Sequence, residues 1–287
     1  MLENFEGTTA VITGGASGIG LGLARRIGRE GANLVIADIE QDALDRAVAE
    51  LQAAGAEVLG VRTDVGKLDD IVALADAAEE RFGNVHLLHN NAGVVTTGMA
   101  EEQSEAQWDW VIDVNLRSVV WGCREFLPRM KAHGEPAHII NTASMAGMIG
   151  GPFMAPYFAT KFAVVGLSES LWHENQQVSS NVGISVLCPG FVRTGIARSD
   201  RNEPDGLGGW VAGGSQTGTQ FAELLSAGVD AGIESADVAE AIVEALAEGR
   251  LWILTHPGSA ESIANRAEAI GGGGVPTGPR MMTDGRG

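Results

Sequence analysis

The chain has 287 residues, of which 45% are hydrophobic, 20% are charged and 40 are glycine, a composition that suits one globular unit with a sizeable core. The formal net charge of −18 argues against binding to nucleic acid or to an anionic membrane. No apolar run approaches the roughly 18–20 residues of a membrane span, and residues 1–7 lack the basic and apolar regions of a secretory signal. We therefore expect a cytoplasmic protein.

Short apolar, β-branched runs alternate with segments of helical period along the chain. The expected strands are Thr9–Thr13, Asn33–Ala37, Glu57–Arg62, Val85–His89, His138–Asn141, Gly183–Leu187 and Leu251–Thr255. This alternation predicts an α/β fold with a doubly wound, seven-stranded parallel sheet and helices on both faces. We expect one domain over residues 1–270, a long loop at Gly206–Gly218 and a flexible Gly/Pro-rich tail over 271–287.

A glycine-rich turn follows the first expected strand and precedes a helix. Glycine lets backbone N–H groups approach a pyrophosphate, and the helix N-terminus adds partial positive charge. The candidate residues of this turn are Gly14, Ser17, Gly18, Ile19 and Gly20. A glycine cluster alone also fits an ordinary turn, so this motif by itself is weak support for a nucleotide site.

Asp38 ends the second expected strand, eighteen residues after Gly20. An acid there accepts hydrogen bonds from the adenosine ribose and repels a 2′-phosphate. Gly15, Ile39 and Glu40 offer no Arg or Lys for that phosphate, so NAD is favoured over NADP. An Asp that merely caps the next helix is the other interpretation, and it does not exclude this role.

Polar or turn-forming residues also follow the later strands. They are Thr63-Asp64-Val65, Asn90-Asn91-Ala92-Gly93, Thr142-Ala143-Ser144 and Cys188-Pro189-Gly190. Ligands bind at the carboxyl edge of an open parallel sheet, so this regularity predicts one site at that edge. No histidine, cysteine or carboxylate pattern predicts a metal site.

Tyr157 and Lys161 lie four residues apart at the start of an expected helix, which places them on one helical face. A phenol with a pKa near ~10 needs nearby positive charge to exchange protons near neutrality. The Lys161 ammonium and an oxidised nicotinamide ring would both supply it. By itself the spacing is more often that of a surface pair, but the preceding motifs favour catalysis.

These motifs together closely resemble the short-chain dehydrogenase/reductase family, in its compact single-domain branch, over about residues 6–255. The resemblance rests on the segment 13–20, Asn90-Asn91-Ala92-Gly93, Asn115, Ser144, Tyr157/Lys161 and the segment 189–194. It implies a Rossmann-type domain that passes a hydride between NAD and an alcohol or ketone.

The resemblance also implies residue roles. The catalytic set would be Asn115, Ser144, Tyr157 and Lys161, with Tyr157 as general acid/base and Asn115 holding a water beside Lys161. Lys161 would also bind the nicotinamide ribose and lower the Tyr157 pKa, and Ser144 would position the reacting oxygen. Further cofactor contacts would come from Ile39, Asp64, Val65, Asn91, Ala92, Gly93, Pro189, Gly190, Val192 and Thr194.

Residues expected near the reacting centre are mostly apolar, which suggests an apolar or aromatic secondary alcohol or its ketone. The substrate-contacting candidates are Met145, Phe153, Met154, Phe191 and Trp210, the last within a glycine-rich segment, 195–227, that we expect to act as a mobile lid. Two alternatives stay open: an NADP-dependent biosynthetic carbonyl reductase, and a non-catalytic NAD-sensing protein on the same fold.

We expect a homotetramer, or failing that a homodimer. Helices around residues 108–130 and 157–177 carry apolar residues beyond what one sheet face needs, namely Trp110, Val119, Phe126 and Trp172. Family relatives pair these helices across a two-fold axis, and closed symmetry is the usual outcome.

Overall fold

A seven-stranded, all-parallel sheet forms the centre of the computed structural model, which describes residues 4–207, 209, 211 and 214–275. The strand order is β3-β2-β1-β4-β5-β6-β7, so the chain winds outward in both directions from β1. The strands are β1 (Thr9–Thr13), β2 (Asn33–Asp38), β3 (Val58–Arg62), β4 (Leu87–Asn90), β5 (Ala137–Thr142), β6 (Val182–Cys188) and β7 (Trp252–Leu254). This confirms the predicted fold class, with strand bounds that differ from expectation by at most two residues.

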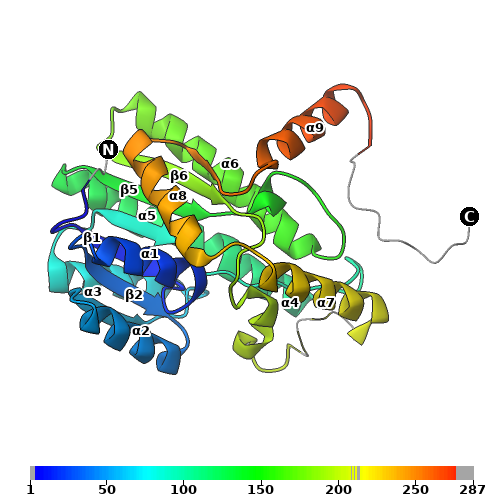
Figure 1. Cartoon of the computed structure of the whole chain (residues 1–287), viewed down its shortest axis with the longest axis horizontal. Helices are drawn as coiled ribbons and strands as arrows, with labels where there is room; N and C mark the ends of the chain where they lie inside the picture. Colours follow the sequence, from blue (N-terminus) through cyan, green and yellow to red (C-terminus); the bar gives the residue numbers. More distant parts are fainter. Residues whose placement is uncertain (1–3, 208, 210, 212–213, 276–287) are drawn as a thin grey trace, which may run out of the picture.

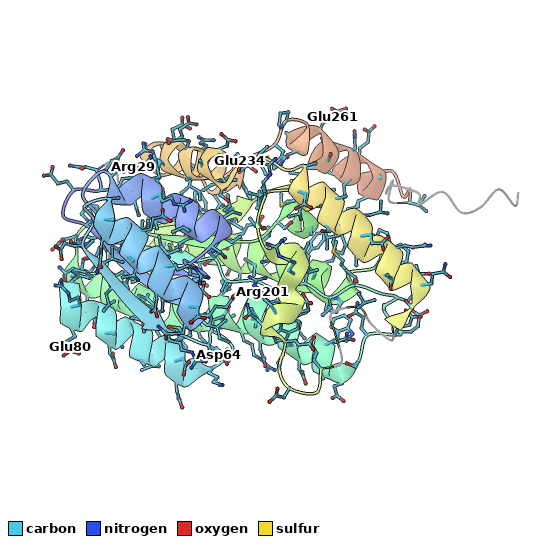
Figure 2. The ribbon with its side chains drawn as sticks, turned by 60° about the horizontal axis from the view of Figure 1, so that its bottom comes forward. Arg29, Asp64, Glu80, Arg201, Glu234 and Glu261 are labelled. Carbon is cyan, nitrogen blue, oxygen red and sulfur yellow. The ribbon has the colours of Figure 1, made fainter. Side chains whose placement is uncertain are left out.

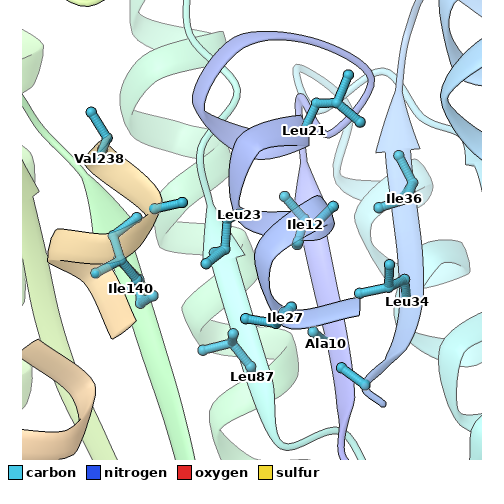
Figure 3. Close-up of a cluster of buried hydrophobic side chains, with 14 of the residues drawn as sticks. Ala10, Ile12, Leu21, Leu23, Ile27, Leu34, Ile36, Leu87, Ile140 and Val238 are labelled. Atoms are coloured by element: carbon cyan, nitrogen blue, oxygen red, sulfur yellow. The ribbon is translucent and has the colours of Figure 1, made fainter. Parts of the chain in front are cut away.

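Three helices cover one face of the sheet: α1 (Gly18–Gly28), α2 (Gln41–Ala53) and α8 (Ser235–Glu248). Ile12 of β1 and Ile36 of β2 pack there against Leu23 and Ile27 of α1, and all four side chains are fully buried (Figure 3). Val238 brings α8 into the same cluster, beside Ile140 of β5. Side chains alternate between the faces of a strand, so Val11 and Val35 point to the opposite side.

The other face is covered by α3 (Leu68–Phe82), α5 (Ser118–His133) and α6 (Ala155–Gln177) (Figure 1). Leu74 of α3, Phe126 of α5 and Val164 of α6 are buried there against Val11, Ile139 and other strand residues. With both faces covered, the ligand-accessible edge is the one where the strands end.

Three side chains that we expected at a subunit interface are used inside the chain instead. Val119 and Phe126 of α5 are buried against the sheet, and Trp110 of α4 (Glu105–Ile112) is buried in a small cluster with Val94 and Val111. Trp172 is partly buried against the same core as Phe126. The apolar excess on these helices is therefore smaller than the sequence suggested, because these side chains pack against the sheet or within a small cluster of the same chain.

The segment 195–227, which we expected to act as a mobile lid, contains two helices. A 3-10 helix, η3 (Ile196–Asn202), lies near its start. The helix α7 (Gln216–Asp230) begins inside the loop expected at Gly206–Gly218, and the Ser215 hydroxyl caps its N-terminus. Trp210 lies outside the described residues. The last helix, α9 (Ser259–Gly271), extends away from the body of the molecule, and the expected tail from residue 276 onward also lies outside the described residues.

Candidate active site

A cleft with a volume of about 1490 Å³ lies at the carboxyl ends of the strands. Residues from the ends of β1 through β6 line it, as the strand-end pattern predicts. Its volume exceeds the ~300–1,000 Å³ of a pocket for one drug-sized ligand, so it has room for a large cofactor and a second molecule.

Close approach requires glycine at two positions, one in the turn after β1 and one in the first turn of α1. A Cβ on Gly14 would lie 3.0 Å from the Cα of Ala92, and one on Gly20 would lie 2.6 Å from the carbonyl oxygen of Gly14. Gly14 and Gly18 also have positive φ values of 60° and 51°. Four of the five candidate residues line the cleft, namely Gly14, Ser17, Gly18 and Ile19. Gly20 does not line it; its lack of a side chain lets α1 pack closely against Gly14. The first turn of α1 carries no acidic residue, so its N-terminus is free to face an anion.

Asp38 lies at the end of β2 with its side chain 9% exposed at the cleft. One carboxylate oxygen accepts a hydrogen bond from the Ala16 N–H at 3.1 Å and the other accepts from the Glu40 N–H at 3.1 Å. Burial raises the pKa of Asp38, and the two backbone hydrogen bonds oppose that rise. Each oxygen keeps lone-pair capacity for a further donor, such as a ribose hydroxyl.

Asn91 ties the glycine turn to the end of β4. Its side-chain amide donates to the carbonyls of Thr13 (3.0 Å) and Gly14 (3.2 Å), and the Thr13 hydroxyl accepts from the backbone N–H of Asn91. Ile39, Asp64, Val65, Asn91, Ala92 and Gly93 line the cleft. The Asp64 carboxylate accepts from the Gly66 N–H and pairs with Lys67 at 3.1 Å, so it shapes the β3 turn.

Tyr157 and Lys161 both face the cleft from the first turns of α6. Lys161 is only 3% exposed, its ammonium donates to the Thr142 carbonyl at 2.9 Å, and it lies 5.5 Å from the centre of the Tyr157 ring. Burial lowers the pKa of Lys161 to about 8. Burial also raises the pKa of Tyr157, and the Ser144 hydroxyl opposes that rise. In the chain alone, therefore, the expected depression of the phenol pKa by Lys161 is not seen.

Ser144 follows β5 and caps the short 3-10 helix η2 (Met145–Gly147). Its hydroxyl accepts from the Ala146 N–H at 3.1 Å and donates to the Pro189 carbonyl at 3.3 Å. These contacts fix the hydroxyl at the cleft wall beside Tyr157.

Asn115 is fully buried in a π-helical turn, η1 (Asp113–Arg117), and does not line the cleft. Its side-chain amide pairs with both the N–H and the carbonyl of Val94, at 2.8 and 2.9 Å. A Cβ on Gly93 would lie 3.4 Å from the Asn115 Oδ1 and 3.6 Å from the Lys161 Nζ, so the three residues meet at one point. The side chain thus anchors the segment after β4 that borders Lys161. Turns of this π-helical kind are frequent at functional sites.

The segment after β6 closes the cleft on the nicotinamide-facing side that the family resemblance implies. Pro189, Gly190, Val192 and Thr194 all line the cleft. His256, just after β7, holds this segment: its Nδ1 accepts from the Gly190 N–H at 3.1 Å, and its Nε2 lies 2.9 Å from the Phe191 carbonyl. A Cβ on Gly190 would lie 3.1 Å from the His256 ring, which explains glycine there.

Apolar side chains line the part of the cleft next to Tyr157. Met145, Met154 and Phe191 are among them, as predicted. Phe153, which we expected to contact the substrate, does not line the cleft. It adopts a positive φ of 65°, and the centre of its ring lies 5.3 Å from the centre of the Phe221 ring. The lining that the sequence reasoning missed comes chiefly from α4 and α7, namely Trp110, Phe221, Leu224, Leu225 and Val229.

Two arginines also line the cleft without having been assigned to it by the sequence reasoning. Arg62 ends β3 and stands opposite Asp38 in the parallel register, so the strand-end rule would have found it. Arg201 comes from η3 and reaches the cleft from the other rim, on the same side of the molecule as Asp64 (Figure 2). No sequence signal links it to Glu40, which lies 161 residues earlier.

Among the residues that the structure describes, no three His, Cys, Asp or Glu side chains gather to hold a metal ion. Within the same residues, no helix is long and apolar enough to cross a membrane.

Comparison with known proteins agrees with this geometry. Residues 8–205 match the family model described as short chain dehydrogenase. The chain is 34% identical over 270 residues to a C alpha-dehydrogenase of a Sphingobium species, covering 94% of this chain and 87% of that protein. It is 32% identical over 280 residues to a CLA biosynthesis dehydrogenase/reductase of Lactiplantibacillus plantarum, covering 96% and 97%.

Among solved structures, a short chain dehydrogenase/reductase from Burkholderia phymatum in complex with NAD superposes with a TM-score of 0.94. It shares 45% identity, and the match covers 98% of this chain and 100% of that one. By these matches the chain belongs to the short-chain dehydrogenase/reductase family.

Proposed function

We propose that the protein is an NAD(H)-dependent oxidoreductase that interconverts an apolar or aromatic secondary alcohol and its ketone. The observation that carries the proposal is one cleft in which Tyr157, Lys161 and Ser144 share the wall with the glycine turn and Asp38. The family relatives named above are dehydrogenases, and the one from Burkholderia phymatum was crystallised with NAD.

The residues at the β1–β2 end of the cleft fit NAD. Gly14 and Gly18 carry no side chain, so a pyrophosphate can approach the backbone at the N-terminus of α1. Glycine is also required there for packing, because a Cβ on Gly14 would meet Ala92 and one on Gly18 would meet Thr194. Asp38 offers carboxylate oxygens for the ribose hydroxyls. In this proposal Lys161 binds the second ribose, and Val192 and Thr194 bind the nicotinamide amide; all three residues line the cleft.

The bound cofactor supplies a nicotinamide carbon that accepts or donates the hydride. Tyr157 donates a proton to the ketone oxygen in reduction and removes the hydroxyl proton in oxidation. Ser144 donates a hydrogen bond to the same oxygen once its proton turns away from the Pro189 carbonyl, while the Ala146 N–H continues to hold the hydroxyl oxygen. Asn115 holds the backbone of Val94 in the segment after β4, and through Gly93 the wall against which Lys161 lies.

The raised pKa of Tyr157 bears on direction. The buried phenol is protonated at neutral pH, which is the form that reduction requires. Oxidation requires the phenolate, so positive charge must be added beside the ring. The ammonium of Lys161, once drawn from the Thr142 carbonyl toward the ring, and the charge of the oxidised cofactor supply it.

The apolar walls support the substrate class. Phe221, Leu224 and Leu225 of α7 line the cleft together with Met145 and Met154, and Phe221, Leu225 and Met154 share a hydrophobic cluster with Tyr157. A neutral, largely apolar molecule is therefore desolvated there at low cost. A panel of aryl and alicyclic secondary alcohols, followed by NADH absorbance, tests the proposal. Turnover of apolar alcohols by the wild type supports it, and turnover only of sugars or hydroxy acids would contradict it.

The NADP-dependent reductase is a second candidate because Arg62 and Arg201 both line the adenosine end of the cleft. Asp38, between them, would repel a 2′-phosphate, and for that reason we favour NAD. Comparing kcat/KM for NAD and NADP with one substrate separates the two. A non-catalytic NAD sensor would show NADH binding without turnover of any alcohol in the panel.

We further propose a cytoplasmic homotetramer, or a homodimer, built through α5 and α6. Val120 of α5 is 39% exposed, and Gly166 of α6 faces open space, so a partner helix can approach closely there. Sedimentation at micromolar concentration tests the assembly, and a stable monomer would contradict it.

Residues 195–227, with Trp210, are proposed to cover the substrate.

A further inference from the structure

Glu40 joins the two rims of the cleft. It lies two residues after Asp38, and its carboxylate accepts hydrogen bonds from Arg201 Nε at 2.7 Å and from Asn202 Nδ2 at 2.8 Å. Arg201 and Asn202 end η3, the first part of the segment that covers the substrate end. Glu40 and Arg201 both line the cleft, so this contact joins the β2 end of the cleft to η3.

Arg201 is held in place for this contact by its own segment. Its guanidinium also donates to the carbonyls of Gly195 (2.8 Å) and Arg198 (2.6 Å). A Cβ on Gly195 would lie 3.2 Å from the guanidinium, so glycine there leaves room for it. The planar Arg201 guanidinium, with its five donors, thus binds two carbonyls of its own segment as well as the Glu40 carboxylate.

The opposite side of η3 is fastened to the catalytic end of the cleft. Ser199 is 3% exposed, and its hydroxyl accepts from the Val95 N–H at 3.2 Å, just beyond the Asn91-Ala92-Gly93 turn. Thr194, immediately before the segment, packs over Gly18, whose Cβ would lie 3.0 Å from it. The segment therefore lies across the cleft, fastened near the substrate end by Ser199 and at the adenosine rim by Glu40.

We infer that Glu40, Arg201 and Asn202 are positioning residues that hold η3 shut over the bound dinucleotide and so set how fast the cofactor leaves. The inference rests on the proposed function for the identity of the cofactor. Ile196, Ser199, Arg201 and Asn202 of η3 line the same cleft as Asp38 and Lys161. A dinucleotide bound between Asp38 and Lys161 would therefore lie against η3, and this segment would have to lift before the cofactor could leave. Opening breaks the Glu40 contacts, because they are the ones that cross the adenosine rim.

The direction of the mutational effects distinguishes a pair that holds η3 shut from a pair that acts only through its charges on Asp38. The charges of the two side chains act on Asp38 with opposite sign: the Glu40 carboxylate raises the Asp38 pKa and the Arg201 guanidinium lowers it. If the pair acted only through the field at Asp38, Glu40→Gln and Arg201→Met would change NADH binding in opposite directions. If it holds η3 shut, both substitutions act in the same direction.

The test measures NADH release by stopped-flow displacement for wild type, Glu40→Gln, Arg201→Met and the double variant. Glu40→Gln keeps the backbone N–H that donates to Asp38 and leaves the α2 N-terminus unchanged, since the Glu40 side chain does not cap that helix. Because the two side chains are 33% and 37% exposed, we expect release to be roughly threefold to fivefold faster in each variant and no faster in the double variant. Arg25→Met, which breaks the similarly exposed Arg25–Glu50 pair away from the cleft, is the control and should leave release unchanged.

Hydrogen exchange supplies a readout that does not depend on bound cofactor. Amides of residues 196–202 should exchange faster in cofactor-free Glu40→Gln and Arg201→Met than in wild type or Arg25→Met. Opposite changes in NADH release, or unchanged release together with unchanged exchange, would overturn the inference. A wild type that binds no NADH would instead contradict the proposed cofactor, while the exchange comparison would still decide whether Glu40 holds η3.

Discussion

The two ends of the cleft are built in different ways. The adenosine end is organised by the continuous stretch β1-α1-β2, in which glycines allow backbone contacts that no other residue tolerates, and the turns after β3 and β4 complete it. The substrate end is made of side chains from α4, η2, α6 and α7, which come from widely separated parts of the chain. Backbone contacts fix the ligand's shape closely, whereas a wall of apolar side chains fixes mainly its polarity, so the cofactor is better specified than the substrate.

The first test of this contrast breaks the chemistry between the two ends. Tyr157→Phe removes the only phenol of the chain and should lower kcat/KM by about 10²–10⁴-fold, the usual contribution of a positioned general acid or base. NADH affinity should stay near that of wild type, because the cofactor contacts lie on other residues. Near-normal turnover in this variant would mean that another group transfers the proton.

The second test addresses the adenosine end. Asp38→Ala removes the acceptor for the ribose hydroxyls and the charge that opposes a 2′-phosphate. Losing a hydrogen bond to a charged group costs about 1.5–3 kcal/mol, so NAD affinity should fall by roughly 10–150-fold. NADP affinity should fall less or rise. A wild type that already binds NADP as tightly as NAD would show that Asp38 does not discriminate.

The third test uses the pH dependence of cofactor binding. Burial lowers the pKa of Lys161 from 10.5 to about 8, so the free enzyme carries the ammonium below that pH and loses it as the pH rises. If the charged form binds the ribose, NADH affinity should fall by up to about tenfold per pH unit once the pH passes the Lys161 pKa. Lys161→Met should bind NADH more weakly and lose this alkaline decline. A decline that persists in Lys161→Met would assign the titration to a different group.

The smallest effect is expected at the substrate end. Phe221→Ala opens the wall provided by α7, and we expect it to shift relative kcat/KM among bulky and small alcohols by about 10-fold, with little change in NADH affinity. Phe162→Ala, which removes a ring packed under Arg266 on the outer side of α6, is the matched control. An identical substrate ranking in wild type and Phe221→Ala would place the substrate elsewhere in the cleft.

The sequence was informative where a local pattern determines the contact. The glycines before α1, Asp38 at a strand end and the Tyr157/Lys161 spacing each depend on neighbours a few residues away or on the parallel register. Arg62 ends β3 and His256 follows β7, so the same rule would have placed Arg62 at the cleft and His256 at the same edge of the sheet. The sheet was predictable for that reason, down to its seven strands.

Contacts between distant segments were not predictable in the same way. Glu40 and Arg201 are 161 residues apart, and the α7 wall depends on how that helix crosses the cleft. Phe153 was misplaced because a positive φ turns its ring against Phe221, and hydrophobicity alone does not encode that turn. Asn115 was placed correctly beside Lys161, but its amide is bound to the Val94 backbone, which only tertiary structure reveals.

The most direct test of the central claim traces the hydride itself. An aryl secondary alcohol carrying deuterium on its carbinol carbon is incubated with NAD and the protein, and the reduced cofactor is examined by mass spectrometry. We predict that the wild type yields NADH with one deuterium, and that Tyr157→Phe, at equal cofactor occupancy, yields almost none. Ketone formation without deuterium in the NADH, or equal labelling by Tyr157→Phe, would contradict direct hydride transfer assisted by Tyr157.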